Sequence, residues 1–341
     1  MRKRISIALA VVAAAVAVPA VVVAASTAYT SPTLKVSQAG TKTVIAASAA
    51  VADDATARAA IYVATGTSIV SNQAPGTPIG SVKAQVSALA LGGALLPLTG
   101  PIIVAPPGAV PAASQTACIQ TATPTATWLL VLQAAGQTIN LPAYLLPTAG
   151  PEAALGPAKV VFCLAPPDIP VELGGATFGA KFLSAELTVD GVFGAVTTGV
   201  WIAFWTPWQA GNGQVNAAGT VASPAAIAPG AVTAKAKKKG LGAVVSGAVS
   251  QSGQPRSNAT VAIWGAKGKA ALRRLGAVKA KANGTYTFTA KTGDVFQARV
   301  VAASGSAPPL CAALTPALGG IPCVNPTVNG FTAQSKQVRK K

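Results

Sequence analysis

The chain has 341 residues, enough for about two domains, and it is 51% hydrophobic but only 10% charged. This composition excludes a disordered chain, which needs low hydrophobicity and high net charge. The sequence contains no histidine, which excludes a Ser-His-Asp triad, a Cys-His nucleophile and an H-E-x-x-H zinc site.

The N-terminal segment has the pattern of an export signal. Three basic residues at positions 2–4 precede Ile5–Ala25, a stretch without charge, and small residues follow it. We expect residues 1–28 to be a signal peptide cleaved after Ala25 or Ala28. The alternative is an uncleaved anchor, because this stretch is long enough to span a bilayer. Both interpretations place the rest of the chain outside the cytoplasm, as a secreted or envelope-associated protein.

Four cysteines in an exported chain predict two disulfides. Their spacing favours Cys118–Cys163 in the first domain and Cys311–Cys323 in the second. A zinc site is disfavoured because the chain has neither a C-x-x-C pair nor a histidine. We therefore expect no metal and no cofactor.

Residues 29–230 are expected to form one β-rich domain or two sub-units, built as Ig-like β-sandwiches. The 34 glycines and 26 prolines of the chain disfavour long helices and suit short strands joined by turns. The segment 53–60 also permits a short helix capped by Asp53. Apolar or alternating runs predict strands at Thr43–Ala49, Ala59–Ala64, Ser81–Leu91, Ile102–Ala105, Thr127–Ala134, Ala158–Leu164, Lys181–Val189 and Gly199–Trp205.

The most aromatic stretch of the chain is 199–208. On a strand, Trp201 and Trp205 share one face, and Ile202 and Phe204 share the other. The two tryptophans have two open interpretations: an exposed pair that stacks on sugar rings, or bulk for an alanine-rich core.

Charge divides the chain into two parts. Residues 29–234 carry six cations and seven acids, whereas residues 235–341 carry 17 Lys and Arg against Asp294 alone. We expect a Pro/Ala/Lys-rich linker at 231–241, a basic domain at 242–335 and a basic tail at 336–341. The candidate polyanion-binding residues are Lys235, Lys237, Lys238, Lys239, Lys267, Lys269, Arg273, Arg274, Lys279 and Lys281.

The basic domain has clear strand periodicity. Strands are expected at 242–249, 259–264, 275–280, 285–289 and 295–302, with a tight turn at Asn283-Gly284. The succession of Ser246–Val249, Gly253–Pro255, Ala259–Ile263, Ala282–Phe288 and Gly293 resembles the carboxypeptidase regulatory-like (transthyretin-like) domain over residues 242–303. This resemblance implies a small Greek-key β-sandwich that acts as an accessory module for stability, spacing or adhesion, related to carbohydrate-binding-like folds. It implies no catalytic residue.

The sequence therefore predicts an exported, non-enzymatic structural or adhesive protein. Its basic domain would bind an anionic wall polymer, acidic polysaccharide or membrane surface, without sequence-specific nucleic-acid recognition. A basic surface that only aids solubility is the simpler explanation of the same charge. A carbohydrate-binding module that uses Trp201 and Trp205 is one alternative. A carboxylate-based hydrolase is another, but Glu186 and Asp190 would lie about 13 Å apart on one strand, beyond the usual separation of catalytic carboxylates.

Overall fold

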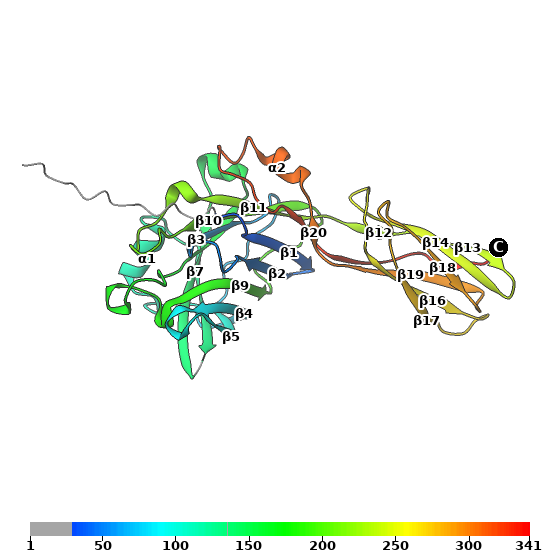
Figure 1. Cartoon of the computed structure of the whole chain (residues 1–341), viewed down its shortest axis with the longest axis horizontal. Coiled ribbons are helices and arrows are strands. Elements are labelled where there is room, and N and C mark those ends of the chain that lie inside the picture. Colours follow the sequence, from blue (N-terminus) through cyan, green and yellow to red (C-terminus); the bar gives the residue numbers. More distant parts are fainter. Residues whose placement is uncertain (1–28, 135) are drawn as a thin grey trace, which may run out of the picture.

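A computed structural model describes residues 29–134 and 136–341, in which strands dominate and helices are short (Figure 1). The expected all-β fold class is confirmed. The signal segment expected at residues 1–28 lies outside the described residues. Within the described part of the chain, no helix has the length and apolar character needed to cross a membrane.

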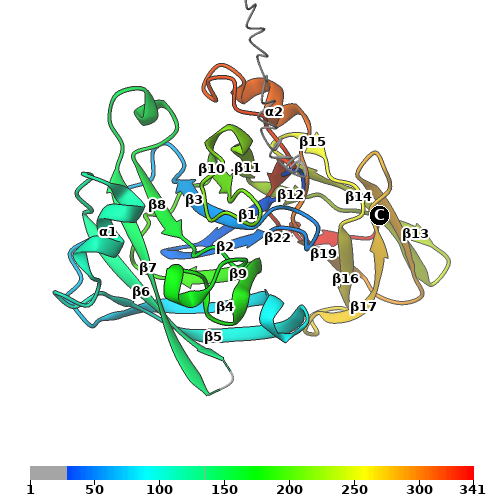
Figure 2. The same cartoon turned by 60° about the vertical axis from the view of Figure 1, so that its left-hand side comes forward.

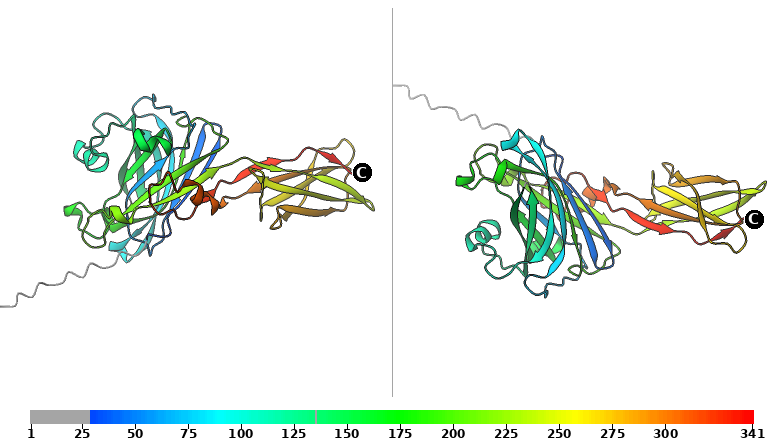
Figure 3. Two further views of the ribbon diagram at one scale, coloured as in Figure 1. Left: turned by 90° about the horizontal axis from the view of Figure 1, so that it is seen from above. Right: turned by 90° about the horizontal axis from the view of Figure 1, so that it is seen from below.

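The chain forms two units, and the large one comprises residues 29–229 and 303–329 (Figure 3). It contains a single 13-stranded sheet, antiparallel except where β11 meets β21. In sheet order the strands are β1 (Thr33–Ala39), β2 (Lys42–Ser48), β9 (Ala180–Val189), β4 (Pro78–Ala88), β5 (Ala94–Val104), β6 (Ala126–Ala134), β7 (Gln137–Pro147), β8 (Ala158–Cys163), β3 (Thr56–Tyr62), β10 (Gly199–Pro207), β11 (Val221–Ile227), β21 (Thr327–Val328) and β20 (Gly305–Ser306).

This sheet curls until its first strand lies beside its far end (Figure 2). Strand β1 contacts β11 and β21, and the hydroxyl of Thr327 donates to the carbonyl of Leu34 at 2.5 Å. The structure thus differs from the Ig-like sandwiches expected for residues 29–230. Because one continuous sheet supplies both walls of the core, no second sheet is needed to bury its apolar face.

All eight segments expected as strands before residue 230 overlap strands, although the end of Ser81–Leu91 forms the 3₁₀ helix η1 (Leu89–Leu91). The helix allowed at 53–60 is wrong, since Thr56 begins β3. The side chain of Asp53 instead accepts hydrogen bonds from the backbone N–H groups of Thr30 and Ser31, at 3.4 and 3.2 Å. Asp53 therefore holds the start of the described chain against the sheet.

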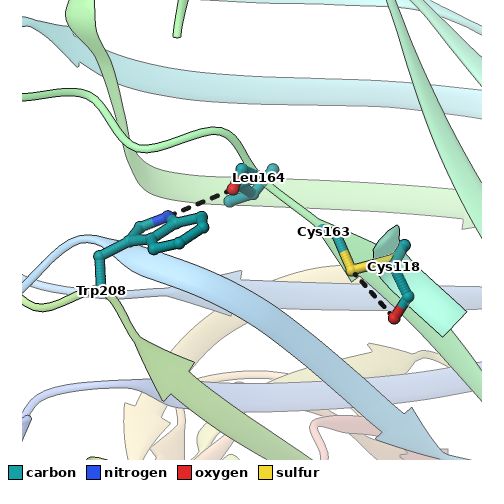
Figure 4. Close-up of a disulfide and its surroundings, with 4 residues drawn as sticks. All are labelled: Cys118, Cys163, Leu164 and Trp208. Atoms are coloured by element: carbon teal, nitrogen blue, oxygen red, sulfur yellow. Dashed lines mark hydrogen bonds between the residues drawn. A yellow bond between two sulfur atoms is a disulfide. The ribbon is translucent and has the colours of Figure 1, made fainter. Parts of the chain in front are cut away.

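A second apolar cluster lies on the outer face of the sheet, where Tyr62, Tyr144 and Ile202 are buried. Two segments cover it: α1 (Ala112–Ile119) and α2 (Pro309–Leu314) with the turn that follows. Each covering segment carries a disulfide: Cys118–Cys163 links α1 to the end of β8, and Cys311–Cys323 links α2 to the chain that follows it. Both pairings are those expected from the sequence. Near the first, Trp208 Nε1 donates to the carbonyl of Leu164 at 3.2 Å (Figure 4). Two disulfides are typical of a protein that works in an oxidising compartment.

The small unit comprises residues 230–302 and 330–341 and packs two five-stranded sheets face to face. The first sheet holds β12 (Gly230–Val232), β13 (Lys235–Lys239), β14 (Gly242–Gln251), β15 (Gln254–Pro255) and β18 (Thr285–Ala290). The second holds β16 (Thr260–Ala266), β17 (Arg273–Lys279), β19 (Val295–Ala302), β22 (Phe331–Gln334) and β23 (Val338–Arg339). Val245 and Tyr286 of one sheet meet Val261 and Phe296 of the other in the core.

The expected domain boundaries differ from the structure in two places. Residues 231–241 are not a free linker, because β12 and β13 both pair with β14. Residues 303–329 leave the basic domain and return to the large unit, so Cys311–Cys323 belongs there. The physical reason is burial: Leu318 is 3% exposed and packs on the outer face of the curled sheet, beside Ala222.

A buried polar cluster joins the two units. Asn329 Oδ1 accepts from the N–H of Ala228 at 2.8 Å and from Gln251 Nε2 at 3.0 Å, while Gln251 Nε2 also reaches the carbonyl of Asn329 at 2.9 Å. Asn329 and Gln251 are 7% and 6% exposed. Because the chain crosses between the units next to these residues, their hydrogen bonds fix the junction.

Replacing Asn329 with leucine should lower the free energy of unfolding by about 1–3 kcal/mol, because the N–H of Ala228 would lose its acceptor, whereas Gln251 Nε2 would keep the backbone carbonyls of Asn329 and Ala228. Urea unfolding followed by tryptophan fluorescence measures the change. Asn212→Leu is the matched control, since Asn212 is exposed and bonds only to its own loop; it should stay within about 0.5 kcal/mol of the wild type. Equal losses of stability in the two variants would contradict the role of Asn329 in fixing the junction.

Candidate functional site: a cationic tip and an apolar cavity

The topology of the small unit brings its cations together at the end far from the large unit. The β13–β14 turn, the β16–β17 loop, the β18–β19 loop and the C-terminus all lie at this end, because Lys239 pairs with Gly242 and Ala266 pairs with Val295. Figure 1 shows the C-terminus there. We call this region the cationic tip; its basic residues are Lys237, Lys238, Lys239, Lys267, Lys269, Arg273, Arg274, Lys291, Arg339, Lys340 and Lys341.

Asp294 is the single acid after residue 234, and it lies within this tip. Its carboxylate accepts from Lys340 Nζ at 2.8 Å and from the N–H of Gly268 at 3.2 Å. The hydrogen bond from Lys340 is the main cause that lowers the pKa of Asp294, and the N–H of Gly268 adds to it. Asp294 therefore neutralises one lysine and leaves the rest of the tip positive.

The end of the chain is part of this tip rather than a free tail. Strand β23 pairs with β19, and the backbone N–H of Lys238 donates to the carbonyl of Lys341 at 2.8 Å. This differs from the basic tail expected at 336–341. The reason is that β13 and β19 would otherwise leave unpaired backbone groups at the sheet edges.

Seven of the ten cations singled out in the sequence lie at the tip, and all ten are exposed. The other three do not join them. Lys235 pairs with Ser246, halfway along β14, and Lys279 pairs with Thr260 toward the large unit. Lys281 follows in the turn before Thr285, whose carbonyl accepts its backbone N–H. Sequence reasoning missed Lys291, and it placed Arg339, Lys340 and Lys341 in a separate basic tail. Only the pairing of strands brings these residues together at one end.

The tryptophan pair expected as a sugar platform is buried. Trp201 and Trp205 are 0% and 1% exposed, and both face the interior of the curled sheet, whereas Ile202 faces the outer cluster. Trp205 Nε1 donates to the hydroxyl of Ser223 at 2.6 Å. The stacking interpretation is wrong for these two rings, because neither presents a face to solvent.

Of the carboxylates considered for hydrolysis, Glu186 lies on β9 and Asp190 directly follows the end of that strand. Glu186 pairs with Lys83 across β4, and Asp190 Oδ1 accepts from the hydroxyl of Thr41 at 2.7 Å. Among the described residues, no three His, Cys, Asp or Glu side chains gather into a group that could hold a metal.

The interior of the large unit contains an apolar cavity that the sequence reasoning did not find. Its volume is about 270 Å³. Among the described residues that line it, Thr56 and Thr177 are the ones with a hydroxyl group, and none carries a charge. Thr56 is already hydrogen-bonded to the hydroxyl of Tyr29. The cavity can therefore hold apolar matter and offers little to a polar solute.

Alanine leaves this space open. Ala47, Ala185 and Ala84 lie side by side on β2, β9 and β4, since Ala185 pairs with both of the others. All three line the cavity. The opposite end of the interior is filled by aromatic rings, where Phe193 lies edge-on to Trp128 and Trp201 with ring centroids 6.2 and 5.1 Å away. The one sequence signal for the cavity was the recurrence of small side chains at inward-facing strand positions. This signal could be interpreted only once the register between strands was known.

No protein-family model matches this chain, and a search of curated proteins found no match either.

Proposed function

We propose that this protein is an exported, non-enzymatic structural or adhesive protein that associates with the cell envelope through the cationic tip. The molecule is elongated, and separate loops meet at one of its ends (Figure 3). The observation that carries the proposal is that these loops hold exposed lysines and arginines. Such a field attracts anionic polymers such as wall polyphosphates and acidic polysaccharides, or anionic membrane surfaces.

The rest of the architecture supports the same proposal. The small unit has two packed sheets, as the resemblance to carboxypeptidase regulatory-like domains implies for residues 242–303. We therefore assign it the accessory role that such Greek-key modules have, holding the large unit at a surface. The two disulfides support a secreted location.

The tip should bind a polyanion in a salt-sensitive manner. The test applies the full chain to immobilised poly(glycerol phosphate) and measures retention across a sodium chloride gradient. The triple variant Lys237→Gln, Lys239→Gln, Lys267→Gln should elute at lower salt than the wild type. For three lost phosphate contacts, the slope of log affinity against log salt should fall by about two to three.

The matched control removes the same charge from the large unit, with Lys35→Gln, Lys42→Gln and Lys83→Gln. These three lysines are exposed on the curled sheet, so this variant should elute close to the wild type. Equal shifts in both variants would show that net charge rather than the tip decides retention. Retention by the wild type that does not change with salt would overturn the electrostatic proposal.

A further inference from the structure

The cavity opens at one end of the large unit. Ala165 and Thr177 line it and are themselves exposed, so they mark its mouth. They belong to the segment 164–179, which follows β8 and crosses this end of the curled sheet. The segment carries two short 3₁₀ helices, η3 (Val171–Leu173) and η4 (Thr177–Gly179).

Exposed apolar side chains gather around this mouth. The 3₁₀ helix η1 (Leu89–Leu91) contacts η4, and η3 precedes the lining residue Gly175. Lys181, which lies between the lining residues Ala180 and Phe182, donates to the carbonyl of Val51 at 2.7 Å. The rim comprises Val51, Leu89, Leu91, Val171 and Leu173, with exposed fractions from 46% for Leu89 to 74% for Leu173.

A rim of this kind is unusual for a surface that meets only water. Single exposed apolar residues need no explanation, whereas a group of them marks a contact with apolar matter. Five of the ten large hydrophobic side chains exposed in the described chain lie on this rim. An apolar cavity therefore continues into an apolar entrance.

The charges beside the mouth indicate the kind of ligand. Lys181 is engaged with the carbonyls of Val51 and Asp53, and burial lowers its pKa while Asp53, Asp54 and Asp168 oppose that shift. Asp168 and Glu172 carry negative charge on the mouth segment itself. An anionic headgroup would be repelled here, whereas a neutral one would not.

We propose that the cavity binds a single hydrocarbon chain of a neutral lipid-like molecule, with its headgroup left at the rim. A volume of about 270 Å³ is larger than the roughly 150 Å³ that accepts one benzene ring, and it is too small for a ligand with several bulky chains. Left empty, the cavity forfeits dispersion contacts for every atom that lines it. A hydrocarbon chain restores those contacts. This activity is separate from polyanion binding at the tip.

The test titrates the full chain with the methyl ester of cis-parinaric acid, an uncharged polyene chain that fluoresces when it leaves water. The wild type should bind it saturably with one molecule per chain. Ala185→Leu fills the cavity and should weaken binding by at least about tenfold, or 1.4 kcal/mol. Ala46→Leu adds the same bulk to the opposite face of β2, beside Glu186, and should bind as the wild type does.

Thermal unfolding of each variant checks the fold, so that lost binding is not lost structure. The free acid of the probe should bind more weakly than the ester. Absence of saturable binding in the wild type, or equal binding by Ala185→Leu and Ala46→Leu, would overturn the proposal. Concentration-dependent dimers that Leu173→Ser abolishes, without any ligand binding, would instead assign the rim to contact between copies of this chain.

Discussion

Replacing Trp201 with alanine should lower the free energy of unfolding by about 3–5 kcal/mol. The indole is fully buried in the curled sheet and lies edge-on to Phe193 at 5.1 Å between ring centroids. It is also among the largest side chains in an interior otherwise rich in alanine and valine. Its removal leaves a space that a closed sheet cannot collapse to fill. Urea unfolding followed by circular dichroism measures the loss.

A pair of phenylalanine variants separates packing from hydrogen bonding. Trp201 Nε1 has no hydrogen-bond partner among the described residues, so Trp201→Phe loses only volume. Trp205→Phe also leaves the hydroxyl of Ser223, which is 0% exposed, without its partner. Trp205→Phe should therefore be the more destabilising of the two by about 1–3 kcal/mol. The reverse order would contradict this account of the two rings.

Removing the disulfide Cys118–Cys163 by double substitution with serine should cost about 4 kcal/mol of stability. Removing Cys311–Cys323 in the same way should cost about 3 kcal/mol. The order follows from the loops that the bonds close in the unfolded chain, because the sequence separations are 45 and 12 and the entropy of closure grows with loop length.

Thermal and urea unfolding of the two double variants measure this difference. Each disulfide also fastens a cover over the outer apolar cluster, so both variants should expose that cluster and bind the dye ANS more strongly. A greater loss for Cys311–Cys323 would show that detachment of the 303–329 segment outweighs loop entropy. Reduction of the wild type should reproduce the combined effect.

In the small unit, hydrophobic periodicity alone was sufficient to predict the main strands. Strands β14, β16, β17, β18 and β19 all lie where alternation predicted them. The hydrophobic period of two is a local property, and each of these strands buries one face in the same core. The tight turn at Asn283-Gly284 was equally local, since Gly284 has a φ of +74° that suits glycine.

Strands whose own residues disfavour strand formation were not predicted from the sequence. Strand β7 contains Asn140 and Pro142, and β11 contains Pro224, residues that disfavour strands. Strand β13 is almost entirely lysine and resembles a linker. These segments become strands because paired neighbours supply their hydrogen bonds. No propensity of the segment itself provides that information.

The sequence by itself determined the strand-rich class, the pairing of the four cysteines and the concentration of positive charge after residue 234. These depend on local alternation, on spacing and on composition. Only the tertiary structure decided that one sheet curls on itself, that Trp201 and Trp205 face inward, and that residues 303–329 return to the large unit. The tertiary structure alone also decided the cationic tip and the row formed by Ala47, Ala185 and Ala84. Each of these features brings together residues far apart in the chain through strand register. Register is set by the burial of whole faces, which no single segment carries.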